Sequence, residues 1–347
     1  MDHNKIRPEW IPSAYKEVTE SGQMNSTNVD SVKLNSNICK GILFGVAIGD
    51  ALGVPVEFKS REEISKQPVT DMIGFGSHRK PAGTFSDDSS LTFCLAESIA
   101  SGFTVDDTAR NFINWRYHNY WTADNEVFDI GITTQNAIDR LVKGTRPDLA
   151  GDFGVRSNGN GSLMRILPLL VHIRNKPMAE RYELIKQVSS ITHGHVRSAI
   201  ACFYYLEFAM GILNRQKKLD IYYNLQKDIA AYSQSIEISQ DERNVFDKLL
   251  IDRIDLIPEN QIQSSGYVLH TLEASIWCLL NTDNYKDAVL KAVNLGNDTD
   301  TTGAVTGGLA GLLYGYESIP EHWLGQLARR EDIEDLAVRM AKSVSTI

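Results

Sequence analysis

The sequence predicts an all-α fold, a single compact multi-helix domain that follows an N-terminal extension. Three observations lead to this prediction. Apolar residues recur at spacings of three and four over nine segments, as on the buried face of a helix. Alternation typical of strands is scarce, and residues 69–74 are its one doubtful example. Glycines recur at every fourth position in two further segments, which is again a helical spacing.

The N-terminal extension covers residues 1–37, and the helical domain covers residues 38–347. Residues 1–36 are rich in Asn, Ser, Asp, Glu and Lys and show no sustained apolar periodicity. Trp10 and Tyr15 are the side chains best suited to anchor this arm on another surface. The stretch lacks the apolar run of a secretory signal, so none is expected.

The apolar periodicity gives the expected helices of the domain in chain order. They span residues 88–101, 105–118, 161–173, 179–192, 196–214, 241–254, 267–281, 284–295 and 332–345. The most polar internal stretch, residues 214–244, is typical either of two surface helices or of an insertion. No linker interrupts the pattern, so we expect one domain.

Two glycine series add two further helices. Their members are Gly41, Gly45, Gly49 and Gly53, and Gly303, Gly307, Gly311 and Gly315. Residues four apart share one face of a helix, so each series forms a smooth ridge. An interior glycine costs about 1 kcal/mol relative to alanine, which favours very close helix packing as the compensation. We expect the two ridges to pack together in a soluble protein, because Asp50 interrupts the first apolar run.

Composition excludes several classes of protein. The chain has 347 residues, of which 42% are hydrophobic and 23% charged, as in ordinary globular proteins. Its net charge of -9 argues against a nucleic-acid binder. No apolar run is long enough to predict a membrane span. The four cysteines are far apart and form no CxxC pair, which favours a reduced, cytoplasmic protein without a zinc ribbon.

Two acidic clusters carry the chemistry. The first is Ser86-Asp87-Asp88-Ser89, and the second is Asp298-Thr299-Asp300-Thr301. If the fold brings them together, four buried carboxylates require cations. Their donors are all hard oxygens, which favours Mg²⁺ or Mn²⁺ over zinc. The sequence therefore predicts a two-metal hydrolase, although each cluster is also typical of a simple helix N-cap.

Helix geometry restricts how these clusters work. Asp298 and Asp300 are two residues apart, which is roughly 200° around a helix. They converge on one ion only in the irregular turn that leads into the glycine-ridged helix. Adjacent Asp87 and Asp88 need the same arrangement, and a helix N-terminus favours their negative charge.

The chain resembles the ADP-ribosylglycohydrolase family in five blocks that follow the family's order. These are GILFGVAIGDALGVPVEF (41–58), GTFSDDSSLT (83–92), SNGNGSLMRILPL (157–169), THGH (192–195) and LGNDTDTTGAVTGGLAG (295–311). The resemblance implies an all-α enzyme with two Mg²⁺ or Mn²⁺ ions. It also implies that the enzyme removes an ADP-ribosyl group from a modified protein side chain by hydrolysis. Arginine is the first candidate for that side chain.

The resemblance assigns roles residue by residue. The implied metal ligands are Ser86, Asp87, Asp88, Asp298, Asp300 and Thr301, and the implied catalytic residues are Asp87, Asp88 and Asp300. The family's Thr-Asp-Asp-Thr carries serine at both hydroxyl positions here, which keeps the oxygens. The implied substrate-binding residues are Glu57, Ser157, Asn158, Gly159, Asn160 and His193. Asp300 and Glu57 are the candidates for the proton donor.

Several of these residues are also compatible with a purely local role. The Asn-Gly-Asn segment is typical of a tight turn. His193 and His195 are compatible with a metal pair or with histidines at a helix start. Glu57 is compatible with a solvated surface position, and Asp50 with a structural role as a hydrogen-bond acceptor near the site.

The extension suggests a partner. Some bacterial members of the family resemble this arrangement and act as immunity proteins against ADP-ribosyltransferase toxins. By that resemblance, residues 1–36 block a toxin while the domain removes ADP-ribose; the alternatives are a disordered leader or an arm packed on its own domain. A second class of function is a non-catalytic binding protein that acts by stoichiometric occlusion. A third is hydrolysis of serine-linked ADP-ribose or of a free ADP-ribose metabolite.

Overall fold

Helices make up nearly all regular structure between residues 34 and 343, the part of the chain that the computed structural model describes. Backbone pairing within this range is limited to three isolated bridges, Phe75–Lys80, Asp152–His193 and Gly159–Tyr267. The predicted all-α class is therefore confirmed, and residues 69–74 form no strand. The proposed arm of residues 1–36 lies outside the described range except for its last three positions.

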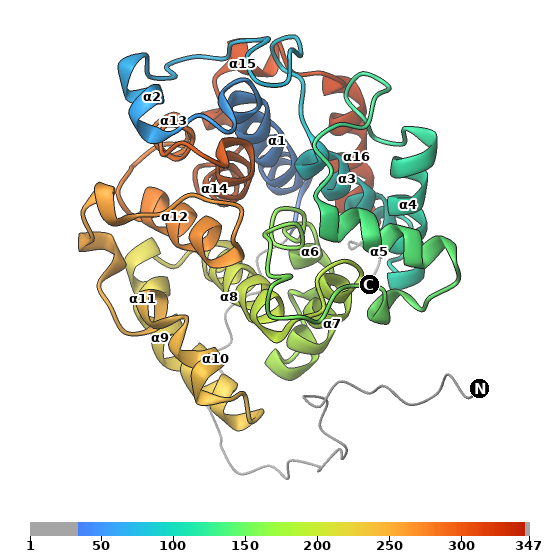
Figure 1. Ribbon diagram of the computed structural model, residues 1–347, viewed down its shortest axis with the longest axis vertical. Helices are drawn as coiled ribbons and strands as arrows, with labels where there is room; N and C mark the ends of the chain where they lie inside the picture. The colour runs from blue at the N-terminus through green and yellow to red at the C-terminus, as the bar shows by residue number, and fades with distance from the viewer. Residues whose placement is uncertain (1–33, 344–347) are drawn as a thin grey trace. The chain divides into compact units, whose positions relative to one another are not determined.

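Figure 1 shows the helices in chain order. The α-helices are α1 (Ser36–Gly53), α2 (Arg61–Lys66), α3 (Asp87–Ala100), α4 (Val105–His118), α5 (Ile132–Val142), α6 (Leu169–Ile173), α7 (Met178–Ser190), α8 (Val196–Leu213), α9 (Lys218–Ser235), α10 (Gln240–Asn244), α11 (Asp247–Leu250), α12 (Val268–Leu280), α13 (Tyr285–Val293), α14 (Thr299–Tyr314), α15 (Glu321–Leu324) and α16 (Arg330–Ser343). Short 3₁₀ turns are η1 (Val54–Val56), η2 (Pro147–Leu149), η3 (Ile254–Leu256), η4 (Glu259–Gln261) and η5 (Tyr316–Ser318).

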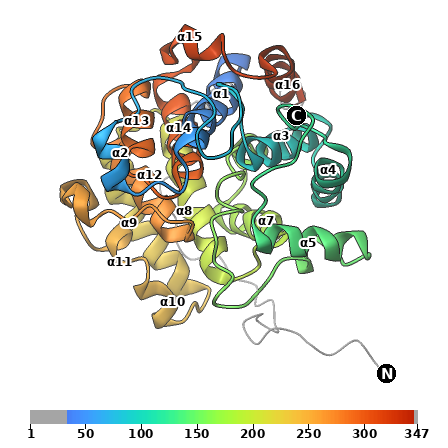
Figure 2. The same ribbon diagram turned by 45° about the horizontal axis from the view of Figure 1, so that its top comes forward.

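The two glycine-ridged helices, α1 and α14, pack directly against each other, as Figures 1 and 2 both show. A Cβ placed on Gly41 would lie 2.5 Å from the carbonyl oxygen of Gly311. Gly45 meets Gly307 and Gly49 meets Gly303 in the same way, so the helices run antiparallel. The ridge stops at Gly311, because Gly315 ends α14 with φ of 86°, and a Cβ placed there would meet no atom of the described residues within 4 Å.

This antiparallel contact positions the acidic residues. The C-terminal end of α1 lies beside the N-terminal end of α14, where Gly53 approaches the backbone of Asp300. The hydroxyl of Thr299 donates to the carbonyl oxygen of Gly53 at 2.8 Å. The packing therefore places the end of α1 and the start of the second acidic cluster next to each other.

Two predicted helices are only partly present. Residues 161–168 form turns, and α6 begins at Leu169 after Pro168. Proline lacks an N–H and disfavours helix at the residue before it, so a helix from 161 to 173 is interrupted there. Residues 241–254 divide into α10, α11 and η3. There the Tyr222 hydroxyl accepts from the N–H of Ile254 and donates to the carbonyl of Asp252, at 3.2 and 2.7 Å.

Other predicted helices match within a few residues, and α9 occupies much of the polar stretch 214–244. The periodicity did not identify α5, because Thr134 and Ala137 make up half of its buried face and give little apolar signal beside Ile138 and Leu141. Among residues 34–343, two helices are long and apolar enough to cross a membrane, but 89% of each apolar window is buried inside the packed protein. They are core helices. All four cysteines are free and buried.

Candidate metal centre and substrate pocket

The first acidic cluster is held by Asp50, a fully buried residue of α1. Its carboxylate accepts the backbone N–H groups of Ser86 and Ser89, both at 3.0 Å. It also accepts the Ser89 hydroxyl at 2.5 Å. Burial raises the pKa of Asp50 to about 6, although these hydrogen bonds oppose the shift. Asp50 thus has the structural role that the sequence suggested.

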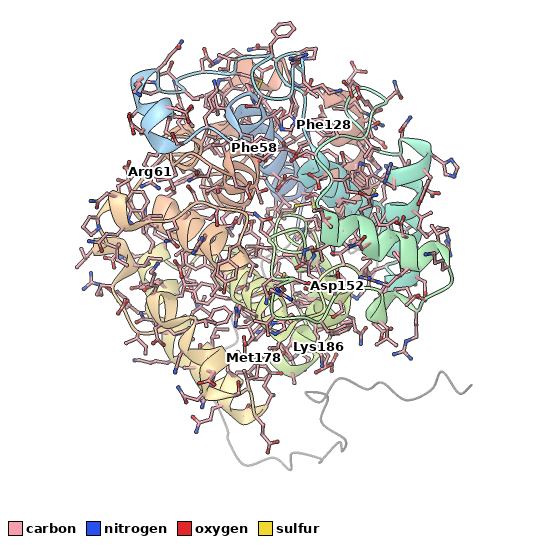
Figure 3. All side chains as sticks on the ribbon, in the orientation of Figure 1. Phe58, Arg61, Phe128, Asp152, Met178 and Lys186 are labelled. Atoms are coloured by element: carbon pink, nitrogen blue, oxygen red, sulfur yellow. The ribbon has the colours of Figure 1, made fainter. Side chains whose placement is uncertain are left out.

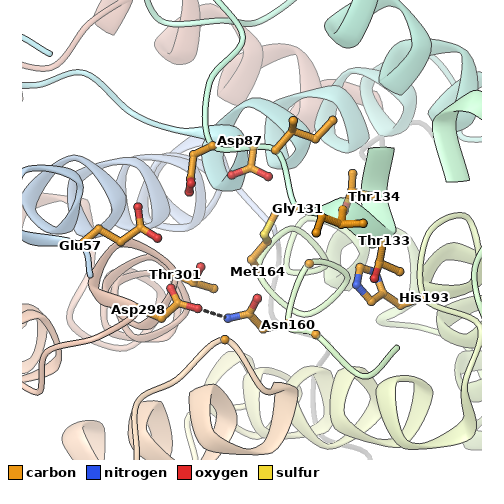
Figure 4. A pocket seen from close by; sticks show the side chains of 16 residues that line it. Glu57, Asp87, Gly131, Thr133, Thr134, Asn160, Met164, His193, Asp298 and Thr301 are labelled. Atoms are coloured by element: carbon orange, nitrogen blue, oxygen red, sulfur yellow. Dashed lines mark hydrogen bonds between the residues drawn. The ribbon is translucent and has the colours of Figure 1, made fainter. Parts of the chain in front are cut away.

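The first cluster does cap its helix, at the start of α3, in addition to lying at the pocket. Ser86 is the N-cap, and its hydroxyl accepts the N–H of Asp88 at 3.2 Å. Asp87 and Asp88 occupy the first turn, where unpaired N–H groups favour negative charge. The cap fixes both carboxylates at the helix end and leaves Asp87 facing the pocket (Figure 4).

The second acidic cluster begins α14 differently. Asp298 stands at the N-cap position, but its side chain makes no capping hydrogen bond. Its carboxylate instead accepts the side-chain N–H of Asn160 at 2.7 Å, drawn as a dashed line in Figure 4. The Asp298 carboxylate is therefore directed to the pocket, which it lines.

The fold brings the two clusters together despite their separation in the chain. The Thr301 hydroxyl lies 3.4 Å from Asp88 Oδ2. Carboxylate oxygens of Asp50, Asp88 and Asp300 all lie within 4.8 Å of one another. Burial raises the pKa of Asp88 and Asp300 well above the ordinary value of 3.8, and neighbouring carboxylates raise it further.

These residues fit a divalent cation. Three buried carboxylate oxygens, Asp88 Oδ1, Asp298 Oδ1 and Asp300 Oδ2, have no hydrogen-bond partner within residues 34–343. A buried acceptor without a partner is costly, whereas a hard cation satisfies several such oxygens at once. The donor set contains oxygens and one imidazole nearby, and no thiolate. The chain therefore has a carboxylate-rich cluster suited to a metal ion.

A second group of candidate ligands includes two residues that the sequence motifs did not indicate. Single donor atoms of Glu57, His78, Asp129 and Asp300 all lie within 4.8 Å of one another. His78 Nε2 contacts a carboxylate oxygen of Glu57. Burial raises the pKa of Glu57, while the hydrogen bond to Glu57 raises the pKa of His78. Burial raises the pKa of Asp129 to about 7.

Glu57 reaches the site because its segment is tied to the loop before α14. The N–H of Phe58 donates to the Asn297 carbonyl, and the N–H of Asn297 donates to the Lys59 carbonyl, both at 2.7 Å. Phe58 and Asn297 both have positive φ, near 65°. Glu57 is only 5% exposed, so the solvated-surface alternative is wrong.

His78 is placed by a turn that wraps over η1. The Ser77 N–H donates to the Pro55 carbonyl at 3.0 Å, and the Ser77 hydroxyl donates to the Glu57 carbonyl at 2.6 Å. Gly76 has φ of 49° and lies against the backbone of Pro55, so only glycine fits there. The imidazole then lies between Phe58 and Phe128, which Figure 3 labels, with ring centroids 5.7 and 5.2 Å away.

The pocket beside the acidic clusters has a volume of about 290 Å³. Figure 4 shows it between the starts of α3 and α14, the loop that precedes α5 and the loop around Asn160. Its walls include Asp87, Asp298 and Thr301 on the acidic side. Residues 129–134, which no sequence motif identified, form the wall on the side of α5.

The predicted substrate loop divides into two halves. Gly159 and Asn160 line the pocket, whereas Ser157 and Asn158 do not. Asn158 is buried, accepts the Ser198 hydroxyl at 3.0 Å and donates to the Val155 carbonyl at 2.8 Å. Its side chain therefore holds the loop rather than a ligand.

The two histidines of the THGH motif have different roles. His193 lines the pocket and is 2% exposed. His195 is the N-cap of α8, and its Nδ1 accepts the Arg197 N–H at 3.2 Å. His195 thus belongs to a helix start, so the two residues do not form a metal pair.

Metal should stabilise the protein, and more so as the pH rises. Without metal, the carboxylates with raised pKa values contribute stability that is fully present below pH 3.8, their ordinary pKa. That contribution is lost as the pH rises through about 6 for Asp50 and about 7 for Asp129. A cation replaces the lost protons, so the rise in Tm on adding Mg²⁺ should be larger at about pH 7.5 than at about pH 5.

Thermal unfolding of chelator-treated protein, with and without added Mg²⁺ or Mn²⁺, measures this difference. Asp106→Asn is a matched control, because Asp106 also stands in the first turn of a helix but is exposed and does not line the pocket. It should show the same metal effect as the unchanged chain. If added metal does not raise the Tm of the unchanged chain, or raises it equally at both pH values, the proposed metal site is contradicted.

Comparison with known proteins agrees with the geometry. The family described as ADP-ribosylglycohydrolase matches residues 33–346. ADP-ribosylarginine hydrolase Tri1 of Serratia proteamaculans is 32% identical over 344 residues, covering 98% of this chain and 85% of that protein. Tri1 of Pseudomonas putida is 33% identical, covering 86% and 76% of the two chains.

More distant relatives support the same grouping. The ADP-ribosyl-[dinitrogen reductase] glycohydrolase of Rhodospirillum rubrum is 29% identical, covering 85% of this chain and 91% of that protein. A solved structure titled "ADP-ribosylglycohydrolase-related protein complex" aligns with a TM-score of 0.74 and 29% identity. It covers 89% of this chain and 98% of the other.

Proposed function

The chain belongs to the ADP-ribosylglycohydrolase family and is a hydrolase of that class, and we propose that it releases ADP-ribose from arginine side chains of modified proteins with the help of two divalent ions. The observation that carries the proposal is the meeting of the two acidic clusters, through Thr301 and Asp88, beside a pocket. Mg²⁺ is the expected metal, with Mn²⁺ as the alternative.

Arginine is favoured as the acceptor for two reasons. Both Tri1 relatives, at 32% and 33% identity, carry the name ADP-ribosylarginine hydrolase. The pocket also presents Glu57, Asp87 and Asp129 on its walls. Carboxylates suit a departing guanidine, because that group leaves as a cation at neutral pH.

Different residues of the site would hold the metal ions and activate the water. When bound, the divalent ions supply Lewis-acid chemistry, which polarises oxygen ligands and lowers the pKa of water. Asp88, Asp298 and Asp300 would hold them, with hydroxyls of Ser86 and Thr301 as neutral neighbours. The Asp87 carboxylate has no hydrogen bond within the described range and faces the pocket, so it is the candidate to orient or deprotonate water.

Hydrolysis exchanges one bond for another at the anomeric carbon. The bond to the guanidine nitrogen breaks, and a bond to the water oxygen forms. Positive charge develops on the sugar, and nearby carboxylates stabilise it. Asp87 takes a proton from water, and the leaving nitrogen needs one in return. Glu57, which is buried and contacts His78, is better placed to donate it than Asp300, which faces the other carboxylates.

The acceptor and the metal are tested together. The full-length protein is incubated with an ADP-ribosyl-arginine protein and, separately, with an ADP-ribosyl-serine peptide and free ADP-ribose metabolites. We expect metal-dependent release of ADP-ribose from arginine, lost with chelator and restored by Mg²⁺ or Mn²⁺. Release from serine alone would move the assignment to the alternative substrate. Tight binding of modified protein without release would favour the non-catalytic alternative of stoichiometric occlusion.

We also propose that residues 1–36 contact a partner, namely an ADP-ribosyltransferase toxin. The family match begins at residue 33, yet the Serratia relative matches 98% of this chain, so that match includes most of the preceding residues. Two measurements test this, ADP-ribose release and inhibition of an ADP-ribosyltransferase toxin, each made on the full chain and on a chain that begins at Leu34, which keeps Asn35, the N-cap of α1. The shortened chain should still hydrolyse but no longer inhibit the toxin. We also propose that the protein is located in the cytoplasm.

A further inference from the structure

His193 turns one ring nitrogen to the pocket and the other to the core. Its Nδ1 lies 2.9 Å from the Thr192 hydroxyl. Its Nε2 lies 3.5 Å from the place that a Cβ on Gly159 would take, at the pocket wall. Within residues 34–343 Nε2 has no hydrogen-bond partner, so a ligand in the pocket can engage it; Figure 4 shows the ring at the pocket edge.

The Thr192 hydroxyl stands between this imidazole and a buried guanidinium. Arg165 Nη2 donates to Thr192 Oγ1 at 2.8 Å. A guanidinium has only donors, so the threonine oxygen must accept in this contact. Thr192 is fully buried, and its hydroxyl proton has no acceptor other than His193 Nδ1 in the described part of the chain. Nδ1 therefore accepts.

A neutral imidazole carries one N–H, and an accepting Nδ1 places that hydrogen on Nε2. We propose that Arg165, acting through Thr192, fixes His193 in the Nε2–H tautomer and so presents a permanent donor to an acceptor oxygen of the ligand in the pocket. Arg165 and Thr192 are thus positioning residues. The identity of that ligand as an ADP-ribosyl group rests on the proposed function.

The surroundings of Arg165 support this role. It is fully buried, its Nε and Nη1 atoms have no partner within residues 34–343, and its cation lies 4.6 Å from the Phe112 ring centroid. A buried cation without a carboxylate is costly, which indicates a specific use. Burial, reinforced by this neighbouring cation, lowers the pKa of His193 to about 3, so the imidazole stays neutral.

Sterics keep the ring in this orientation. A Cβ on Gly161 would lie 2.8 Å from His193 Cε1, so a side chain there would displace the ring. The His193 N–H and the Ser189 hydroxyl add two hydrogen bonds that fix the backbone, the first at 2.8 Å to the Ser189 carbonyl and the second at 2.9 Å to the His193 carbonyl. The imidazole can therefore donate in one direction only.

The tautomer is tested first, in the full-length protein without substrate. Histidine ring nitrogens labelled with ¹⁵N report which nitrogen is protonated, and the spectrum of His193→Gln identifies the signals of His193. We expect the Nε2–H form, unchanged from about pH 5 to about pH 8. Thr192→Val should lose this preference, whereas Thr192→Ser, which keeps the hydroxyl, should retain it. A charged ring or an Nδ1–H form would overturn the proposal.

Binding is tested next, by calorimetry with ADP-ribose on the metal-loaded protein. Loss of one oriented hydrogen bond should weaken binding by about three- to tenfold in Thr192→Val, with Thr192→Ser close to the unchanged chain. His193→Gln, which offers an N–H near the position of Nε2, should bind more tightly than His193→Asn. Equal affinity of Thr192→Val and Thr192→Ser, at similar Tm, would overturn the role in binding.

The two readouts separate this inference from the proposed function. If the unchanged chain fails to bind ADP-ribose, the proposed function fails, while the tautomer is still measured in the free protein. If hydrolysis is confirmed but His193 is not in the Nε2–H form, the inference alone fails.

Discussion

Asp300→Asn should lose more than roughly 1,000-fold in the rate of ADP-ribose release and remain folded. Asp300 is fully buried, belongs to both groups of candidate ligands and has one oxygen without a partner. Substitution of residues that merely support metal ligands commonly costs 10- to 100-fold, so loss of a shared ligand should cost more. The amide is nearly isosteric, which keeps the packing.

Stability distinguishes this result from simple unfolding. Removal of one carboxylate relieves repulsion among buried acids, so the metal-free variant should be at least as stable as the unchanged chain. Added Mg²⁺ should then raise its Tm by much less. Rate assays and thermal unfolding on the same samples measure both effects, with Asp106→Asn as the control expected to retain activity. Full activity in Asp300→Asn would rule out the proposed metal centre.

Much of the fold was predictable because it depends on local patterns. Helix α4, Val105–His118, has the bounds that apolar spacing predicted, since its buried face repeats at three and four. The close contact of α1 and α14 was also predictable, because glycines at every fourth position cost helix stability unless a second backbone packs on them. The break at 161–168 was visible in Pro168, whereas the break in 241–254 depends on Tyr222, a residue of another helix.

The site was only partly predictable. The acidic clusters lie in short motifs, and their convergence follows from the packing of α1 and α14. His78 and Asp129 are single residues in loops, and only tertiary structure brings them to Glu57. A local signal for His78 did exist, since Gly76 marks a turn two residues earlier. Nothing in the sequence separated Asn158, which holds the loop, from Asn160, which faces the pocket.

Gly307→Ala should destabilise the protein by about 3 kcal/mol, because overpacking against rigid backbone has no cheap relief. A Cβ on Gly307 would overlap the carbonyl oxygen of Gly45 and lie 3.2 Å from the carbonyl carbon of Gly45. These are backbone atoms in the interior of α1, and they cannot move without the helix. Room for the new methyl group therefore requires α1 and α14 to move apart. The intrinsic helix preference of alanine, about 1 kcal/mol, acts in the opposite direction and is too small to compensate.

Gly308→Ala is the matched control, one residue further along α14. A Cβ there would meet side chains rather than backbone, Leu167 at 2.6 Å, Val46 at 2.9 Å and the Tyr205 hydroxyl at 3.0 Å, and side chains shift more easily than a packed backbone. Its change in unfolding free energy should therefore stay within about 1 kcal/mol. Denaturant unfolding compares the two variants. Equal losses would mean that backbone contact between the ridges does not set the spacing of α1 and α14. In that case the position of Asp300 relative to Asp50 would depend on contacts outside the glycine ridges.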